Sequence, residues 1–241
     1  MLLSIETSTS ACSVALHDGN TLLGCYELHT ERTSAAMLTT LIGDLIKHTG
    51  HELRDLDAIA VAKGPGSYTG LRIGVSTAKG LCFALDKPLL SVNTLRALTE
   101  QVRPNLTHAS ADSLFHSLTL SPLTFCPMID ARRMEVYCAF YDADGREIRP
   151  TAAEIIDENS FADLLSSGPV VFFGDGADKC RAVLGEHPNA IFLNETVVPS
   201  ARTVGKLAGT LLADCRFEDV ATFEPFYLKE FMTTQRKRAI I

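Results

Sequence analysis

Residues 63–85 read KGPGSYTGLRIGVSTAKGLCFAL, a Gly-rich turn that leads into a helix. The short apolar run at 58–62 just before it is typical of a buried strand. Gly64-Pro65-Gly66 predicts a turn. The hydroxyl of Ser67 or Thr69 can then cap a helix by accepting a bond from a free backbone N–H. Because the residue before Pro88 is disfavoured in a helix, we expect the helix to end near residue 85.

Apolar and small side chains cover nearly the whole circumference of this predicted helix when it is wound at about 100° per residue. What remains is a narrow, only partly polar strip that consists of Arg72, Ser76, Lys79 and Phe83. A helix with so little polar surface is buried on more than one side. Its second cover is either another part of the same chain or a partner protein, and composition does not decide between the two.

The chain has 241 residues, of which 46% are hydrophobic, and a formal net charge of −7. A hydrophobic content of that size supports a sizeable core, and the acidic balance disfavours nucleic-acid binding by the whole surface. The seven cysteines are scattered and form no C-x-x-C pair, which is typical of free thiols in a reducing cytoplasm. We expect neither a leader peptide nor a membrane span, because no apolar segment approaches the required ~20 residues.

The order of predicted elements is duplicated along the chain. The first half is predicted as strands 2–5, 11–16 and 22–28, helix 34–48, strand 58–62, helix 67–85 and strand 89–92. The second half is predicted as strands 125–129, 135–141 and 147 onward, a helix near 160–166, strand 170–173, a helix to about 184, strand 190–193 and a last helix 201–215. Residues 104–122 are predicted as an irregular hinge, and the basic stretch 233–238 as a mobile end.

Two βββαβαβ units in tandem are the plan of the actin, hexokinase and Hsp70-type ATPase superfamily, an α/β fold made of two RNase H-like domains. In that plan the first hairpin turn of each half faces phosphate across a cleft between the halves. The residues predicted for a degenerate nucleotide cleft are Glu6, Thr7 and Ser8 in the first half, and Asp130, Arg132, Gly174 and Gly176 in the second. Such short polar turns are common by chance, so a capped, hydrogen-bonded turn is the alternative.

A more specific signal comes from the motif KGPGSYTGLRIGVSTAKGL together with IETSTSACSVAL at residues 5–16, PMIDARRMEVY at 127–137 and PFYLK at 225–229. With these motifs the chain resembles the TsaB (YeaZ) family, whose members are paralogues of TsaD in the bacterial synthesis of threonylcarbamoyladenosine on tRNA. The resemblance spans the chain and is strongest from residue 1 to about 98. The stretch 104–122 departs from it, because the corresponding link in the family is shorter.

The resemblance implies a non-catalytic scaffold and activator that pairs with a TsaD homologue, is joined by a TsaE homologue, and forms a homodimer when alone. It reaches tRNA only within the complex and has no cofactor of its own, since ATP, Mg²⁺ and a metal belong to the partner subunits. The implied domains are 1–100, completed by the helix near 201–216, then 101–200, with a tail at 217–241. The first two helices supply the implied partner interface through Met37, Leu41, Leu45, Gly70, Ile73, Gly74, Thr77 and Gly80.

The sequence also bears on catalysis. The catalytic paralogue carries a metal-binding His-x-x-x-His pair on its first helix, whereas residues 33–38 here contain no histidine. The alternatives are a small ATP-dependent phosphotransferase of the same fold, a glycoprotease-like peptidase and a stand-alone interaction module. For Arg132 and Arg133 two roles remain open: contact with phosphate or tRNA, or a structural ion pair.

Overall fold

The computed structural model describes residues 1–29, 34–107 and 123–229, in which two five-stranded sheets are built on the same plan. The first sheet has the order β3-β2-β1-β4-β5; β1 pairs antiparallel with β2 and parallel with β4, and β2 pairs antiparallel with β3. Its strands are β1 (Leu2–Glu6), β2 (Cys12–Asp18), β3 (Thr21–Leu28), β4 (Ala58–Gly64) and β5 (Leu89–Asn93).

The second sheet repeats this arrangement with the order β10-β9-β6-β7-β8, in which β6 pairs antiparallel with β7 and parallel with β9. Its strands are β6 (Thr124–Asp130), β7 (Glu135–Tyr141), β8 (Glu147–Ile155), β9 (Val170–Phe173) and β10 (Ala190–Phe192). The predicted fold class, two RNase H-like α/β units in tandem, is confirmed.

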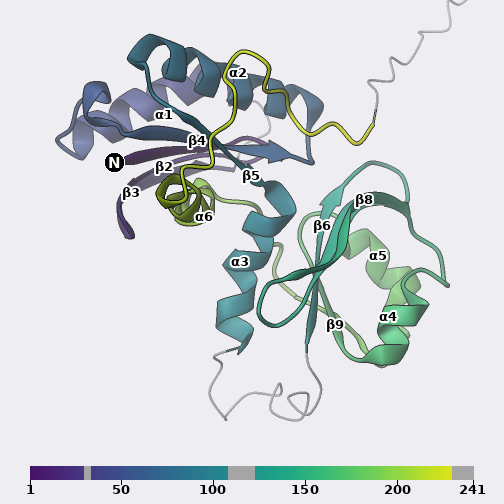
Figure 1. Cartoon of the computed structure of the whole chain (residues 1–241). Coiled ribbons are helices and arrows are strands. Elements are labelled where there is room, and N and C mark those ends of the chain that lie inside the picture. The colour runs from purple at the N-terminus through teal and green to yellow at the C-terminus, as the bar shows by residue number, and fades with distance from the viewer. Residues whose placement is uncertain (30–33, 108–122, 230–241) are drawn as a thin grey trace, which may run out of the picture.

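Helices cover both faces of each sheet (Figure 1). On the first sheet, α1 and α2 lie on one face and α6 on the other; on the second sheet, α4 and α5 share one face. The alternating pattern of the strands accounts for this, because successive side chains of a strand point to opposite faces. In β4, Ile59 and Val61 pack with α1 and α2, whereas Ala58, Ala60 and Ala62 pack with α6. The helices are α1 (Ser34–His48), the 3-10 turn η1 (Leu53–Asp55), α2 (Tyr68–Leu85), α3 (Thr94–Thr107), α4 (Ala162–Ser167), α5 (Ala177–Leu184) and α6 (Ala201–Ala213).

Helix α3 was not predicted, and part of it falls where an irregular hinge was expected. The side chain of Asn93 begins the helix by accepting bonds from the N–H groups of Leu95 and Arg96 at 2.9 and 3.2 Å. Pro104 lies inside α3, where it cannot donate the helical hydrogen bond to the carbonyl of Glu100, and the helix ends at Thr107. The prediction of irregular chain from residue 104 is therefore wrong as far as Thr107, and residues 108–122 lie outside the described part of the chain.

The last helix of each half covers the sheet of the other half. Leu95, Leu98 and Val102 of α3 pack against the second sheet, in a cluster with Phe125 and Phe173. In return, α6 packs against β1, β4 and β5 of the first sheet. The two halves are therefore joined by exchanged helices rather than by one flexible link.

The segment after α6, predicted as part of a tail, is packed on the first half as far as Tyr227 and reaches the second half at Lys229. The N–H of Glu218 donates to the carbonyl of Leu89 at 2.9 Å, next to the edge strand β5. The ammonium of Lys79 on α2 donates to the carbonyl of Phe223 at 2.9 Å, and the Phe223 side chain enters the first core. We call residues 217–229 the strap; Figure 1 shows it in yellow beside α2, running on toward the second half.

Candidate functional site

The Gly-rich turn and helix α2 form as predicted. Helix α2 starts at Tyr68 with Ser67 as its cap, and the Ser67 hydroxyl accepts a bond from the N–H of Gly70 at 3.3 Å. It ends at Leu85, followed by Asp86 in the left-handed conformation. The start of α2 is thereby fixed directly over the end of β1, where the first predicted cleft turn lies.

The turn at Glu6, Thr7 and Ser8 is buried beneath α2 rather than open to a cleft. The Thr7 hydroxyl donates to the carbonyl of Gly70 at 2.8 Å, and the N–H of Ser67 donates to the carbonyl of Ser8 at 2.6 Å. These bonds tie the turn to the helix that covers it.

Three glycines make this close approach possible. A Cβ at Gly66 would overlap the carbonyl oxygen of Ser8, and a Cβ at Gly70 would overlap that of Thr7. At Gly74 it would overlap the hydroxyl of Thr7. The assignment of Gly70 and Gly74 to a partner interface is therefore wrong, because both glycines face the chain's own turn. The same contacts close the turn against α2, which disfavours a phosphate there.

The carboxyl of Glu6 has an unusual setting. Its Oε1 accepts the N–H of Ser8 at 2.6 Å, whereas Oε2 and the Ser8 hydroxyl have no partner among the described residues. Burial raises the pKa of Glu6 to about 7, and hydrogen bonding from Ser8 offsets this only in part. A carboxyl that is sealed from water and half protonated near neutral pH is poorly suited to hold a hydrated Mg²⁺.

The matching turn of the second half is more open. Asp130 forms an ion pair with Lys179 of α5 and accepts the N–H of Arg132 at 3.1 Å, while its own N–H donates to Asp175 at 3.0 Å. Burial raises the pKa of Asp175 above its ordinary value. Arg132 and Arg133 are exposed on the turn, at φ +66° and +46°.

The glycines of the second-half cleft are also internal. A Cβ at Gly174 would overlap the carbonyl of Met128, and a Cβ at Gly176 would come within 2.8 Å of the carbonyl carbon of Ile129. Both glycines thus let the turn after β9 pack on β6. No hydrogen bond between described residues joins the turn at Glu6 to the turn at Asp130.

The strap connects the two halves at this place, which the sequence did not predict. The N–H of Phe226 donates to the carbonyl of Lys63 at 2.7 Å on the first half. On the second half, Lys229 forms an ion pair with Glu135 and lies 5.8 Å from the centre of the Tyr137 ring. A cavity of about 30 Å³ remains between the strap, the Gly-rich turn and Tyr137. The PFYLK motif at residues 225–229 is the sequence signal for this contact.

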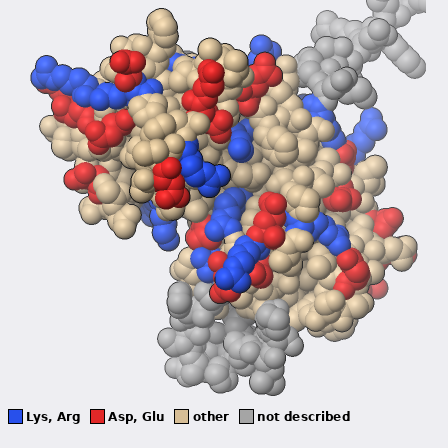
Figure 2. All heavy atoms as spheres, viewed as in Figure 1, with Lys and Arg blue, Asp and Glu red and all other residues tan. Residues whose placement is uncertain are grey.

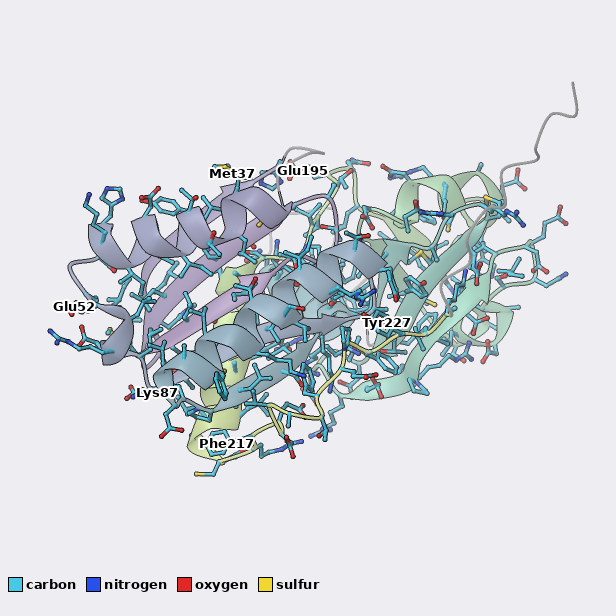
Figure 3. The ribbon with its side chains drawn as sticks, turned by 90° about the horizontal axis from the view of Figure 1, so that it is seen from above. Met37, Glu52, Lys87, Glu195, Phe217 and Tyr227 are labelled. Atoms are coloured by element: carbon cyan, nitrogen blue, oxygen red, sulfur yellow. The ribbon has the colours of Figure 1, made fainter. Side chains whose placement is uncertain are left out.

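The predicted partner interface divides into an inner and an outer set. Leu41 and Leu45 are core residues of α1, with 8% and 2% of their surface exposed, so they are not available to a partner. Met37 is 37% exposed, and Gly80 is exposed with no heavy atom within 4 Å of an added Cβ. Ile73 and Thr77 are half-buried between these surfaces. Figure 3 shows Met37 on the outer side of α1, and only this outer set can contact another protein.

A larger cavity of about 730 Å³ opens in the second half, between the end of β8 and the ends of α4 and α5. Two of its polar side chains are occupied locally: Asp157 accepts bonds from Asn159 and Ser160, and His187 accepts one from Asn189. Within residues 1–29, 34–107 and 123–229, no three His, Cys, Asp or Glu side chains are gathered as metal ligands would be. Nor does that part of the chain contain a helix long and apolar enough to cross a membrane.

Comparisons with known proteins agree with this architecture. Residues 27–171 match the family model described as TsaD: tRNA N6-adenosine threonylcarbamoyltransferase. The tRNA threonylcarbamoyladenosine biosynthesis protein TsaB of Escherichia coli (strain K12) is 29% identical over 239 residues, covering 95% of this chain and 94% of that protein.

Two solved structures from Pseudomonas aeruginosa match the fold over nearly their whole length. A protein described as uncharacterized, with similarity to peptidase YEAZ, has a TM-score of 0.76 and 28% identity, covering 95% of this chain and 99% of that one. A second structure, described as YeaZ, has a TM-score of 0.73 and 27% identity, covering 94% and 99%. The chain therefore belongs to the TsaB/YeaZ family, TsaD-related proteins of tRNA threonylcarbamoyladenosine biosynthesis.

Proposed function

We propose that the chain is a non-catalytic scaffold and activator subunit for transfer of the threonylcarbamoyl group to the adenosine next to the anticodon of tRNA. It acts in the cytoplasm as the heterodimer partner of a TsaD homologue, with a TsaE homologue joining the assembly. ATP, Mg²⁺ and the catalytic metal are bound by those partners, and the chain forms a homodimer when it is alone.

The observation that carries the proposal is the closed turn at Glu6, Thr7 and Ser8. In the ATPase plan this turn must admit a phosphate, but here the carbonyls of Thr7 and Ser8 touch Gly70 and Gly66. The first helix adds to this, because residues 33–38 lack the histidine pair that the catalytic paralogue uses. Both features favour a subunit that supports the chemistry of another chain.

The outer surface of α1 and α2 supports the partner role. It combines Met37 with the half-buried Ile73 and Thr77 and the bare backbone at Gly80, which lets another helix approach closely. At about 25 cal/mol per Å², a few hundred Å² of apolar surface covered here contributes several kcal/mol before the cost of association. That is enough for a specific pair, provided the polar rim is also satisfied.

The proposal is tested by measuring threonylcarbamoyl transfer to tRNA with the chain alone, the transferase alone, and both with the TsaE homologue and ATP. We expect transfer only when the chain and the transferase are combined. Turnover by the isolated chain would contradict the non-catalytic role, and full turnover without the chain would contradict the activator role.

The interface is tested with Gly80→Arg, which places a large charged side chain on the outer surface without meeting another residue of the fold. Thr210→Arg, an exposed position of α6 on the other side of the first sheet, is the matched control. Light scattering should show that Gly80→Arg loses both the homodimer and the pair with the transferase, whereas Thr210→Arg keeps both. Equal masses for the two variants would place the interface elsewhere.

A further inference from the structure

The junction of the two halves carries a second exposed surface, distinct from the outer face of α1 and α2. Its first part is an aromatic pair: the rings of Tyr68 on α2 and Tyr227 on the strap lie 4.8 Å apart at 32°. Arg72, one turn along α2, lies 5.4 Å from the centre of the Tyr68 ring and donates to its hydroxyl at 3.2 Å. Tyr227 is 37% exposed, and Figure 3 shows it on the strap where the first half meets the second.

The second part comes from the other half and borders the same small cavity. Tyr137 of β7 lines that cavity together with Tyr68 and Tyr227. Burial raises the pKa of Tyr137, and the charges of Lys229 and of Arg132, on the turn that leads into β7, offset part of this rise. The junction therefore carries three tyrosines around one small cavity. The guanidinium group of Arg72 lies on the first half, and those of Arg132 and Arg133 lie on the turn before β7.

Two acidic side chains of this region are paired within the fold, whereas the exposed Glu224 on the strap forms no ion pair with any described residue. Asp130 is paired with Lys179, and Glu135 is paired with Lys229. By contrast, Arg72, Arg132 and Arg133 form no ion pair with any described residue. Three guanidinium groups are therefore left to meet an external anion, on a chain whose total charge is −7. Figure 2 shows basic side chains beside the point where the described chain ends, on a face whose charges are otherwise mixed.

The backbone of the Arg132–Arg133 turn supports the same conclusion. Both residues adopt positive φ, a region that costs a non-glycine residue about 1–2 kcal/mol. The turn is nevertheless held firmly, since Asp130 accepts the N–H of Arg132 and Lys179 donates to the carbonyl of Glu135 at 2.7 Å. This conformation presents both arginine side chains to solvent from a turn whose backbone is held in place.

We propose that this surface, defined by Tyr68, Arg72, Arg132, Arg133, Tyr137 and Tyr227, is a contact site for an RNA strand. Guanidinium groups pair with phosphate oxygens, and the exposed ring of Tyr227, backed by the half-buried Tyr68, can stack on an unpaired base. An acidic protein would use the arginines but not the ring faces, so the combination favours nucleic acid. The inference rests on the proposed function in one respect only, that tRNA is the substrate of the assembly.

The test is binding of purified tRNA, and of a single-stranded RNA dodecamer, to the full chain alone and to the chain mixed with its transferase partner. The variants are Arg132→Ala/Arg133→Ala, Arg72→Ala and Tyr227→Ala. The control, Lys206→Ala/Arg216→Ala, removes two charges from exposed positions on and just after α6. Thermal unfolding confirms that each variant is folded, and light scattering reports assembly with the transferase separately.

We expect the Arg132/Arg133 double variant to bind tRNA about tenfold more weakly or worse at 0.1 M salt, with the slope of log K against log[salt] reduced by about 1.4–1.8 for two lost phosphate contacts. Arg72→Ala should reduce the slope by about half as much. Tyr227→Ala should weaken binding by about tenfold without changing the slope, because stacking does not release counterions. The control should bind as the unaltered chain does.

The inference is overturned if the unaltered chain binds neither RNA in either form, or if the control loses as much affinity as the double variant. It is also overturned if the double variant keeps its tRNA affinity but no longer assembles with the transferase, because the surface would then be a protein contact. Failure of the unaltered chain to assemble would count against the proposed function instead, and RNA binding by the chain alone would still decide this inference.

Discussion

At the level of single residues, the buried carboxyl of Glu6 is the clearest source of pH dependence. Its pKa is about 7 in the folded chain against 4.5 when free, so the unfolded state holds fewer protons between these values. The stability associated with protonated Glu6 is complete below about pH 4.5 and is lost as the pH rises through about 7. Glu6→Gln should remove this loss, so its stability relative to the unaltered chain should rise by up to about 3 kcal/mol between pH 4.5 and 7.5.

Urea unfolding of both proteins across that pH range measures the effect, and the difference between them cancels the other titrating groups. His17 is one of these other groups. Burial lowers its pKa, so its contribution to stability is lost as the pH falls below about 6.5, which is opposite in sign to the effect of Glu6. Parallel pH profiles for the two proteins would mean that Glu6 is not the titrating group. The sequence identified Glu6 as a cleft residue but not as a sealed one, since its cover comes from Gly66 and Ser67, sixty residues later in the chain.

At the level of elements, α2 contains a matched pair of glycines whose replacement should have opposite effects. Gly74→Ala places a methyl group against the Thr7 hydroxyl and should destabilise the fold by about 1–3 kcal/mol, as overpacking does. Gly80→Ala adds a methyl group in open space and should stabilise it by up to about 1 kcal/mol, the difference in helix propensity. Urea unfolding of the two variants measures both effects, and equal signs would contradict the packing described for α2.

The same helix shows what the sequence could and could not predict. Its start at the Ser67 cap, its end at Leu85 and its burial on more than one side follow from turn chemistry and periodicity. Which glycine faces inward does not follow, because that depends on where β1 ends in space. The cap residue Asn93 and the spacing of Leu95, Leu98 and Val102 are typical of a helix. Pro104, by contrast, is typical of a helix break, and the two signals conflict.

At the level of the whole molecule, the strap is anchored firmly on one half and weakly on the other. On the first half, the Phe223 side chain is 9% exposed in the core, and the ammonium of Lys79 binds the carbonyls of Ala221 and Phe223. On the second half the main tie is the ion pair between Lys229 and Glu135, which is partly exposed. Such pairs contribute about 0–1 kcal/mol, whereas removal of a buried phenylalanine costs about 3–5 kcal/mol.

This asymmetry predicts different effects for two changes to the strap. A chain that ends after Arg216 should be at least about 3 kcal/mol less stable than one that ends after Lys229, because it loses the Phe223 packing and the bonds to Lys79. Lys229→Ala in the full chain should cost at most about 1 kcal/mol. Urea unfolding of the two truncated chains, the full chain and its Lys229→Ala variant gives both differences. A Lys229→Ala loss as large as the truncation would mean that the junction with the second half, and not the first core, holds the strap in place.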